Sequence, residues 1–301
     1  MHRGNARPSN PDRKKRKVRR KNYFQLSLHS LRRYQISMRY REPQTIYFHG
    51  IPGGCAELKM FGRDIASQGS NFVVANRNLA SSRIDSEKFS QIAESLREQF
   101  PGRPLRFVGF SLGAAAALRV AECLGEQVEK LDLVSPAAPL ELGDYLSSMA
   151  GAAVFRSARD RPRAFALMSK GQSWLARVSP QTLFAALFYN ANGADRDLRT
   201  DPEFRAAMLE VLRESLVENL DTYRDEIRSY VSGWSHVFPS VTQRVAIFHG
   251  VRDNWSPPAM AEDLASALPN CDELNLIDDC SHYTALRHYF YNYERMGSAR
   301  Q

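Results

Sequence analysis

LRFVGFSLGAAAALRVAECL, residues 105–124, is the stretch of sequence from which the fold can be inferred. Its apolar beginning predicts a buried strand, and Leu112–Leu124 predicts an alanine-rich helix. Within the motif GFSLG, residues 109–113, only residues 109–111 separate the two, so the turn from strand to helix must be very tight. Such a turn strains the backbone of its serine and lifts the hydroxyl off the sheet edge, and flanking glycines leave room for it. Ser111 is therefore a candidate nucleophile.

Short apolar runs alternate with helical spacing on both sides of this stretch. The predicted buried strands are Ile46–Phe48, Phe72–Ala75, Leu105–Val108, Leu131–Ser135, Val245–Phe248 and Leu274–Ile277. The predicted helices between and after them are Ser86–Phe100, Leu112–Leu124, Pro258–Leu268 and Tyr283–Tyr293. This order predicts an α/β protein with a mostly parallel, doubly wound sheet. Upstream, Tyr23–His29 and Tyr34–Tyr40 alternate apolar and polar residues and predict antiparallel edge strands.

The alternation of strands and helices breaks in the middle of the chain. From about Leu140 to Val241 almost only helical spacing is found, as in Phe204–Leu220 and Asp221–Val231. We therefore predict a core of residues 22–139 and 241–301 and an inserted helical cap of residues 140–240. The strands on either side of the insertion should end at the same edge of the sheet as Ser111, so the cap should cover the serine.

The net charge of +8 is concentrated at the N-terminus. Residues 1–21 hold ten basic side chains and one acidic side chain, whereas the other 280 residues hold 31 basic and 32 acidic side chains. We expect a disordered basic arm, and the near-neutral remainder argues against a nucleic-acid-binding face across the body. Within the arm, Lys14–Val18 resembles a nuclear-localisation signal. Alternatives are contact with acidic lipid or nucleic acid, or a merely solvated tail.

Composition excludes several classes of protein. A hydrophobic fraction of 43% and a charged fraction of 25% predict a folded globule, and no apolar run is long enough for a membrane span. No apolar region follows the N-terminal charges, so we expect no secretory signal. We expect no metal or nucleotide cofactor, because HExxH, P-loop and strand-linked GxGxxG patterns are absent. Reduced thiols in the cytoplasm fit the cysteines, which form no CxxC pair: Cys55, Cys123, Cys271 and Cys280.

A serine nucleophile needs a base, and the base needs an acid to orient it. His282 follows the last predicted strand, in a loop at the carboxyl end, where open α/β sheets place their sites. Asp253 stands three residues past Gly250 on another such loop. We take His282 as the general base and Asp253 as its orienting acid. Asp278 and Asp279 are competitors, although they lie on the loop of the histidine itself.

Acyl transfer also needs hydrogen-bond donors for the developing oxyanion. The backbone N–H of Leu112, directly after the nucleophile, is one candidate. The second should come from the glycine-rich loop HGIPGG, residues 49–54, which follows a predicted strand. Ile51 is the candidate donor in this loop, because Pro52 has no N–H.

Together these motifs resemble the α/β-hydrolase fold superfamily. HGIPGG resembles its oxyanion loop, GFSLGA its nucleophile elbow, GVRDNWSPP its acid loop and CSH its histidine loop, in that order within residues 22–295. The resemblance implies a Ser111–Asp253–His282 triad that cleaves a carboxylic ester or thioester through an acyl-serine. A serine in the elbow speaks against dehalogenases and epoxide hydrolases, and GFSLGA differs from the GGSWG-like elbow of proline iminopeptidases.

Other activities are compatible with the same triad. Carbon–carbon bond hydrolysis, acyl transfer to an alcohol and cofactor-free oxygen chemistry occur on this fold, as do ligand-binding members without activity. The predicted cap is rich in aromatic and aliphatic residues, which predicts an apolar acyl pocket and a substrate with an apolar or aromatic portion. The cap residues that we select as candidates for substrate binding are Trp174, Phe184 and Phe188.

Overall fold

The computed structural model describes residues 43–61, 72–78 and 85–298. The predicted arm of residues 1–21 and the two predicted edge strands, Tyr23–His29 and Tyr34–Tyr40, lie outside the described residues. In the described part, six parallel strands form one sheet in the order β2-β1-β3-β4-β5-β6. The strands are β1 (Gln44–Phe48), β2 (Phe72–Val74), β3 (Leu105–Phe110), β4 (Val128–Val134), β5 (Arg244–Gly250) and β6 (Cys271–Ile277).

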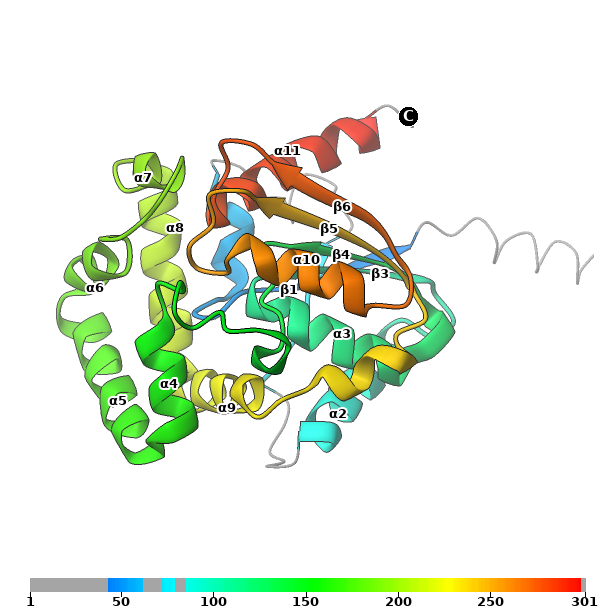
Figure 1. Ribbon diagram of the computed structural model, residues 1–301, viewed down its shortest axis with the longest axis horizontal. Coiled ribbons are helices and arrows are strands. Elements are labelled where there is room, and N and C mark those ends of the chain that lie inside the picture. Colours follow the sequence, from blue (N-terminus) through cyan, green and yellow to red (C-terminus); the bar gives the residue numbers. More distant parts are fainter. Residues whose placement is uncertain (1–42, 62–71, 79–84, 299–301) are drawn as a thin grey trace, which may run out of the picture. The chain divides into compact units, whose positions relative to one another are not determined.

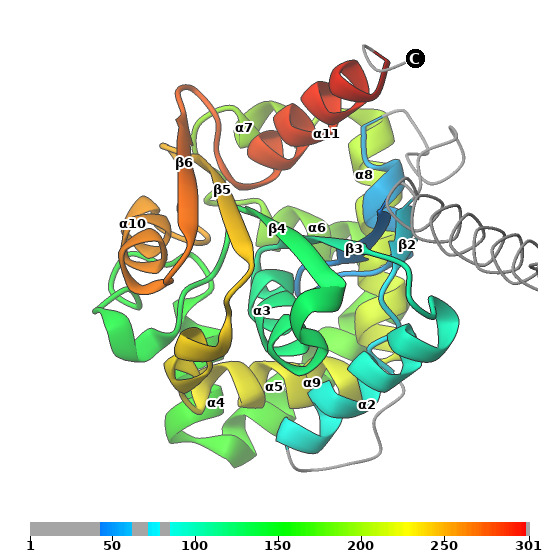
Figure 2. The same cartoon turned by 90° about the vertical axis from the view of Figure 1, so that its right-hand side faces the viewer.

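Helices cover both faces of this sheet. Figures 1 and 2 show α11 on one face and α2, α3 and α10 on the other. Strand β1 is buried along its whole length, as expected for a parallel strand with helices on both sides. The predicted α/β class with a parallel, doubly wound sheet is confirmed. The bounds of the helices are α2 (Asp85–Gln99), α3 (Leu112–Leu124), α10 (Pro258–Ala267) and α11 (His282–Ser298).

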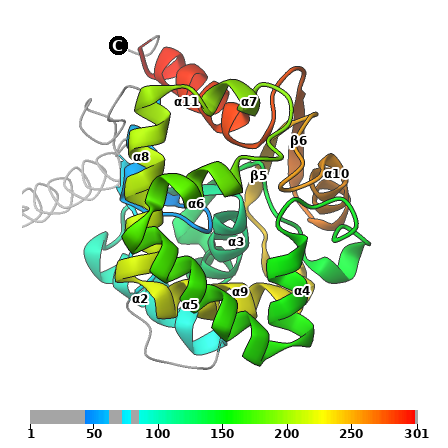
Figure 3. The ribbon, with the colours of Figure 1, turned by 90° about the vertical axis from the view of Figure 1, so that its left-hand side faces the viewer.

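The chain between β4 and β5 forms helices and turns and contributes no strand, and all of it is described. Figures 1 and 3 show α4 to α8 grouped beside the edge of the sheet at which the strands end. Helices α5, α6 and α8 each begin with a proline, which tolerates the first helical position because it needs no N–H there. The main helices of this segment are α4 (Ala152–Asp160), α5 (Pro162–Val178), α6 (Pro180–Leu187), α7 (Asp195–Leu198), α8 (Pro202–Arg213) and α9 (Leu220–Val231).

The helical spacing over Phe204–Leu220 corresponds to more than one helical element. Helix α8 ends at Arg213 and is followed by a π-helical turn, η4 (Glu214–Glu218). The backbone N–H and the side-chain amide of Asn219 both donate to the carbonyl oxygen of Glu214, at 3.0 and 2.9 Å. These bonds span five residues, which widens the turn, and the hydrophobic pattern carries no sign of them.

The turn between β3 and α3 fits against β1 only because residue 113 is a glycine. A Cβ atom on Gly113 would lie 2.1 Å from the carbonyl oxygen of Phe48, which no side-chain motion could relieve because that oxygen belongs to the backbone of a central strand. The start of α3 and the end of β1 are therefore in direct backbone contact.

This contact predicts the effect of a single methyl group. Gly113→Ala should lower the free energy of unfolding by about 3 kcal/mol, because the backbones must separate to admit the methyl group. The control is Gly171→Ala in α5, where nothing lies within 4 Å of an added Cβ. There alanine should raise stability by about 0.5–1 kcal/mol. Urea unfolding of both variants is the measurement, and equal stabilities would contradict the close contact.

Candidate active site

Ser111 occupies the strained turn that the sequence predicts. Its φ and ψ are 54° and −125°, a conformation that side-chain-bearing residues rarely adopt, and the residue is 6% exposed. The turn is tied to β4 and the segment after it. The N–H of Ser111 donates to the carbonyl of Val134 at 3.0 Å, and its own carbonyl accepts from Ala137 at 3.2 Å. A Cβ on Gly109 would lie 2.7 Å from the Cα of Ala114. The first glycine of the motif is therefore also required, because there is no room for a side chain.

His282 and Asp253 form a buried pair. His282 is the first residue of α11, and its Nδ1 lies 2.7 Å from Oδ2 of Asp253. The other carboxylate oxygen accepts from the backbone N–H groups of Trp255 and Ser256, at 2.8 and 3.0 Å. The aspartate is thus fixed with one oxygen toward the imidazole, which favours a proton on Nδ1 and leaves Nε2 to accept one. The competing acids at positions 278 and 279 are exposed and make no hydrogen bond to the histidine.

Phe110, next to Ser111 in the chain, contacts His282. The ring of Phe110, the residue before Ser111, lies 4.8 Å from the imidazole of His282, centroid to centroid. No hydrogen bond joins Oγ of Ser111 to Nε2 of His282 in the described structure. Such bonds are often long without substrate and tighten in the Michaelis complex. The structure therefore brings the three predicted triad residues to one edge of the sheet.

The two predicted oxyanion donors lie on adjoining loops. A Cβ on Gly113 would come within 2.4 Å of the carbonyl oxygen of His49, so the HGIPGG loop passes directly beside the start of α3. The backbone N–H groups of Ile51 and Leu112 donate to no other group in the described part of the chain. Both are thus available to a substrate oxygen.

Glu57 holds the start of the HGIPGG loop through hydrogen bonds, and sequence reasoning missed it. Both of its carboxylate oxygens lie 3.1 Å from the N–H of Gly50, and one accepts from the hydroxyl of Tyr47 at 2.7 Å. Its side chain is fully buried, and this burial raises the pKa of the Glu57 carboxyl to about 7. Glu57 lies in η1 (Cys55–Lys59), where nothing in the local sequence distinguishes it from an ordinary surface glutamate.

Asp195 is a second missed residue, and it fixes the start of the histidine helix. It lies on α7, yet its carboxylate accepts from the N–H of Tyr283 at 3.0 Å and from the N–H and hydroxyl of Thr284 at 2.8 Å. These contacts satisfy N–H groups that a helix cannot satisfy at its own N-terminus. Burial raises the pKa of the Asp195 carboxyl. A cap from a residue 88 positions upstream leaves no local signal.

His249 is a third buried group beside the triad. Its Nε2 donates to the carbonyl of Ser256 at 2.9 Å and lies 3.6 Å from Oδ2 of Asp253. Burial lowers the pKa of His249, so this imidazole is neutral at neutral pH and contributes no charge of its own beside Asp253. It holds the loop that carries the acid.

Of the three predicted substrate-binding residues, the structure brings two toward the site. Phe188 is fully buried, with its ring 5.8 Å from Trp255 and 5.4 Å from Tyr283, and Trp255 stacks on His282 at 6.1 Å. Phe184 lies behind it, 4.8 Å from Phe188. Trp174 is not brought to this group: it lies on α5 and is 63% exposed.

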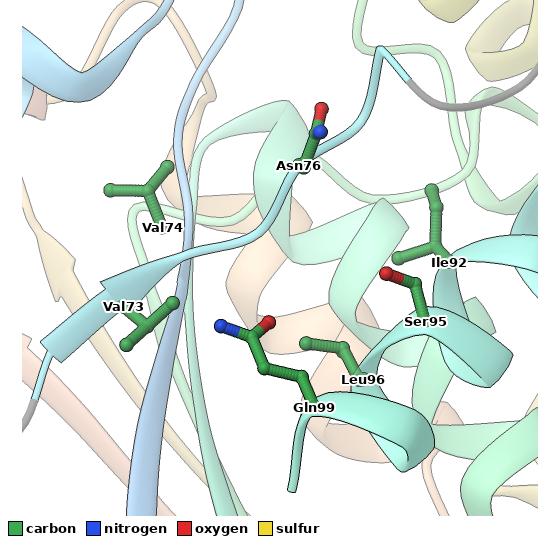
Figure 4. A pocket seen from close by; sticks show the side chains of 7 residues that line it. All are labelled: Val73, Val74, Asn76, Ile92, Ser95, Leu96 and Gln99. Carbon is green, nitrogen blue, oxygen red and sulfur yellow. The ribbon is translucent and has the colours of Figure 1, made fainter.

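A polar cavity of about 320 Å³ adjoins the HGIPGG loop. Ile51 contributes to its wall, the chain after β2 adds Asn76 and Asn78, and the helical segment adds Asn219 and Thr222. A second cavity, of about 280 Å³, lies between β2 and α2 (Figure 4), away from the triad. Ser111 lines neither cavity.

Other features of the described residues bear on cofactors and location. No group of three His, Cys, Asp or Glu side chains gathers closely enough within residues 43–61, 72–78 and 85–298 to hold a metal ion. The four cysteines are all free thiols. None of the described helices is both long and apolar enough to cross a membrane.

Comparison with known proteins points to the same family as the site. The model of the family described as "Alpha/beta hydrolase family" matches residues 64–290. A comparison with curated proteins found no match.

Several solved structures share the fold. A putative non-heme bromoperoxidase from Mycobacterium tuberculosis is 17% identical with a TM-score of 0.56, covering 86% of this chain and 91% of that one. An enol-lactonase from Burkholderia xenovorans is 15% identical with a TM-score of 0.56, covering 86% and 92%. A putative lipase from Acinetobacter baumannii is 14% identical with a TM-score of 0.58, covering 86% of each chain. At these identities the likeness shows the fold.

The Asp253–His282 pair predicts a selective loss of turnover. Asp253→Asn should lower kcat on a p-nitrophenyl ester by about 10⁴, with KM nearly unchanged, because the amide favours the wrong imidazole tautomer. Asp279→Asn is the matched control and should behave as the wild type. If the control loses turnover and Asp253→Asn does not, the acid has been misassigned.

Glu57 predicts a pH dependence of stability. Below pH 4.5 its carboxyl is protonated in both states, whereas between pH 4.5 and about 7 the unfolded chain ionises and the folded chain keeps the proton. Stability therefore falls as the pH rises through this range, by about 3 kcal/mol relative to Glu57→Gln, which mimics the protonated acid. Urea unfolding across this range checks it, with the exposed Glu129→Gln as control. Parallel curves for wild type and Glu57→Gln would contradict the prediction.

Proposed function

The chain belongs to the alpha/beta hydrolase family, and on that premise we propose that it is a serine hydrolase that cleaves a carboxylic ester or thioester through an acyl-serine. The observation that carries the proposal is the 2.7 Å contact between Nδ1 of His282 and Oδ2 of Asp253, at the edge of the sheet where Ser111 is held at a positive φ. A hydrophobic core needs neither feature. A histidine oriented by an acid suits a general base, and the strained turn is the one in which a nucleophile elbow presents its serine.

The proposed reaction has two halves, in which Ser111 is first acylated and then deacylated. Oγ of Ser111 attacks the carbonyl carbon while Nε2 of His282 takes the hydroxyl proton. The N–H groups of Ile51 and Leu112 stabilise the oxyanion of the tetrahedral intermediate. Its collapse breaks the bond to the alcohol or thiol, which leaves with the proton from His282. Water then attacks the acyl-serine and gives a proton to the same nitrogen. Collapse of the second tetrahedral intermediate breaks the bond between Oγ of Ser111 and the acyl carbon, and His282 returns its proton to Oγ as the acid leaves.

The surroundings of the triad favour a substrate with two unlike ends. Phe188, Trp255 and Tyr283 form an aromatic wall beside His282, which suits an apolar or aromatic portion. The cavity beyond Ile51 is lined by amide, hydroxyl and charged side chains, the charged ones of both signs, which suit a polar portion. We therefore propose an ester or thioester that joins such parts.

Removal of the nucleophile tests the proposal directly. Ser111→Ala should lower kcat on p-nitrophenyl esters by about 10⁴ to 10⁶ and abolish labelling by a fluorophosphonate probe, with an unchanged circular dichroism spectrum. The exposed Ser266→Ala is the control and should label as the wild type. A Ser111→Ala protein that retains more than about a tenth of kcat would overturn the assignment. A wild-type protein that neither labels nor turns over would instead favour a ligand-binding member of the family.

The aromatic wall predicts chain-length selection. Across p-nitrophenyl esters from acetate to decanoate, the wild type should prefer the longer acyl chains, and Phe188→Ala should shift that preference more than it changes kcat on acetate. Trp174→Ala serves as the control, because that side chain is 63% exposed and should leave the profile unchanged. A wild-type profile that favours acetate and is unmoved by Phe188→Ala would show that this residue only packs the helices.

A further inference from the structure

Helix α5 presents an apolar stripe to solvent. Leu167, Trp174 and Val178 are 73%, 63% and 56% exposed. Their spacing of seven and four residues places them on one face of the helix, and the exposed Ala164 and Gly171 lie between them on the same face. Four of the eight exposed large apolar side chains in the described chain fall within residues 161–194, the fourth being Tyr189 at 75%. Such a concentration marks an interaction surface, whereas single exposed apolar residues are ordinary.

The same segment carries only positive charge. Residues 161–194 contain four basic side chains and no acidic one, although the chain after residue 21 is close to neutral. Arg163, Lys170 and Arg177 follow one another at intervals of seven and form a basic row along α5. Arg163 and Lys170 stand four residues before Leu167 and Trp174, so the row borders the apolar stripe. Within the described residues no acidic side chain forms an ion pair with any of the three.

The surface is accessible from outside the molecule. Figures 1 and 3 show α5 on the outer side of the helical segment, with α6 beside it and the sheet behind. The opposite face of α5 is the one that packs inward, through Phe165, Ser169 and Ala176. The exposed stripe therefore does not belong to the hydrophobic core.

We propose that α5 docks this protein onto an anionic lipid surface. A helix of this kind lies in the plane of the interface, with its apolar stripe among the upper acyl chains and its cations against lipid phosphates. Tryptophan and tyrosine are enriched at membrane interfaces, and Trp174 within the stripe is 63% exposed. This binding is separate from catalysis and does not depend on the proposed function.

A second copy of the chain would fit the same surface less well. The stripe from Ala164 to Val178 alternates steps of three and four residues, as in a helix–helix seam. Pairing two such helices would bring basic row against basic row, and residues 161–194 offer no acid to compensate. Like charges at these positions destabilise a pair, whereas an anionic bilayer supplies the opposite charge.

The test measures binding of the full chain to phosphatidylcholine vesicles with and without phosphatidylglycerol, by sedimentation. We expect strong binding only where phosphatidylglycerol is present. The emission of Trp174 should shift to the blue on binding and be quenched by brominated acyl chains. Of the other two tryptophans, Trp234 is 1% exposed and Trp255 packs against Phe188 and His282. The emission of a Trp174→Phe protein gives their background and should not shift on vesicles.

Two triple variants locate the binding surface. Changing the basic row to glutamine should weaken binding to the anionic vesicles by about ten-fold or more, and changing Leu167, Trp174 and Val178 to serine should do the same. The matched control removes the same charge from exposed positions elsewhere and should bind as the wild type; its changes are Lys59→Gln, Arg199→Gln and Arg287→Gln. Thermal unfolding of each variant establishes that it is folded.

The same experiment also controls for binding of lipid by the basic N-terminal arm. Every variant is also made in a full chain in which Lys14, Lys15, Arg16 and Lys17 are serine. Dependence on the basic row and the apolar stripe should persist in that background. Variants of α5 that sediment as the wild type, or unchanged Trp174 emission on vesicles, would overturn the proposal. If light scattering shows a dimer, and changing Leu167, Trp174 and Val178 to serine dissociates it, the partner of this surface is a second copy of the chain and not lipid.

Discussion

The site depends on a contact between two stretches of backbone. The start of α3 passes so close to the end of β1 that a methyl group at Gly113 would overlap the carbonyl of Phe48. This approach places the HGIPGG loop beside the residue after Ser111, and so fixes where a substrate oxygen can sit between the two loops. A side chain at this position would push the two loops apart and so separate the N–H groups of Ile51 and Leu112. The glycines are thus a condition for the geometry of the site as well as for the turn.

Three buried carboxylates hold the loops around this contact, and all three do so through backbone N–H groups. Glu57 accepts from Gly50 in the HGIPGG loop, Asp253 accepts from two N–H groups of its own loop, and Asp195 accepts from the first turn of α11. The oxygens of one carboxyl group can accept several such bonds at once, which satisfies N–H groups that burial removes from water. The loops are therefore positioned by electrostatics as much as by packing, in a region where apolar contacts alone would leave N–H groups without partners.

The sequence predicts the parts of the site that depend on local chemistry. Ser111 follows from the glycines and the tight turn, and His282 and Asp253 follow from their places after successive strands. Asp195 could not be found this way, because its partners lie 88 and 89 positions further along the chain. Periodicity also failed to assign the faces of α5: Phe165 is buried and Leu167 is exposed, although both fit a helical apolar pattern. Which face packs inward is decided by the neighbouring helices.

Asp195 couples the helical segment to the start of α11. It lies in the helical segment beside the carboxyl edge of the sheet, yet it bonds to the residues directly after His282. If α7 moves away from α11, those bonds must break and the first turn of the histidine helix loses its cap. The position of α7 and the start of the helix that begins with His282 are thus coupled, so a rearrangement of one requires an answering change in the other.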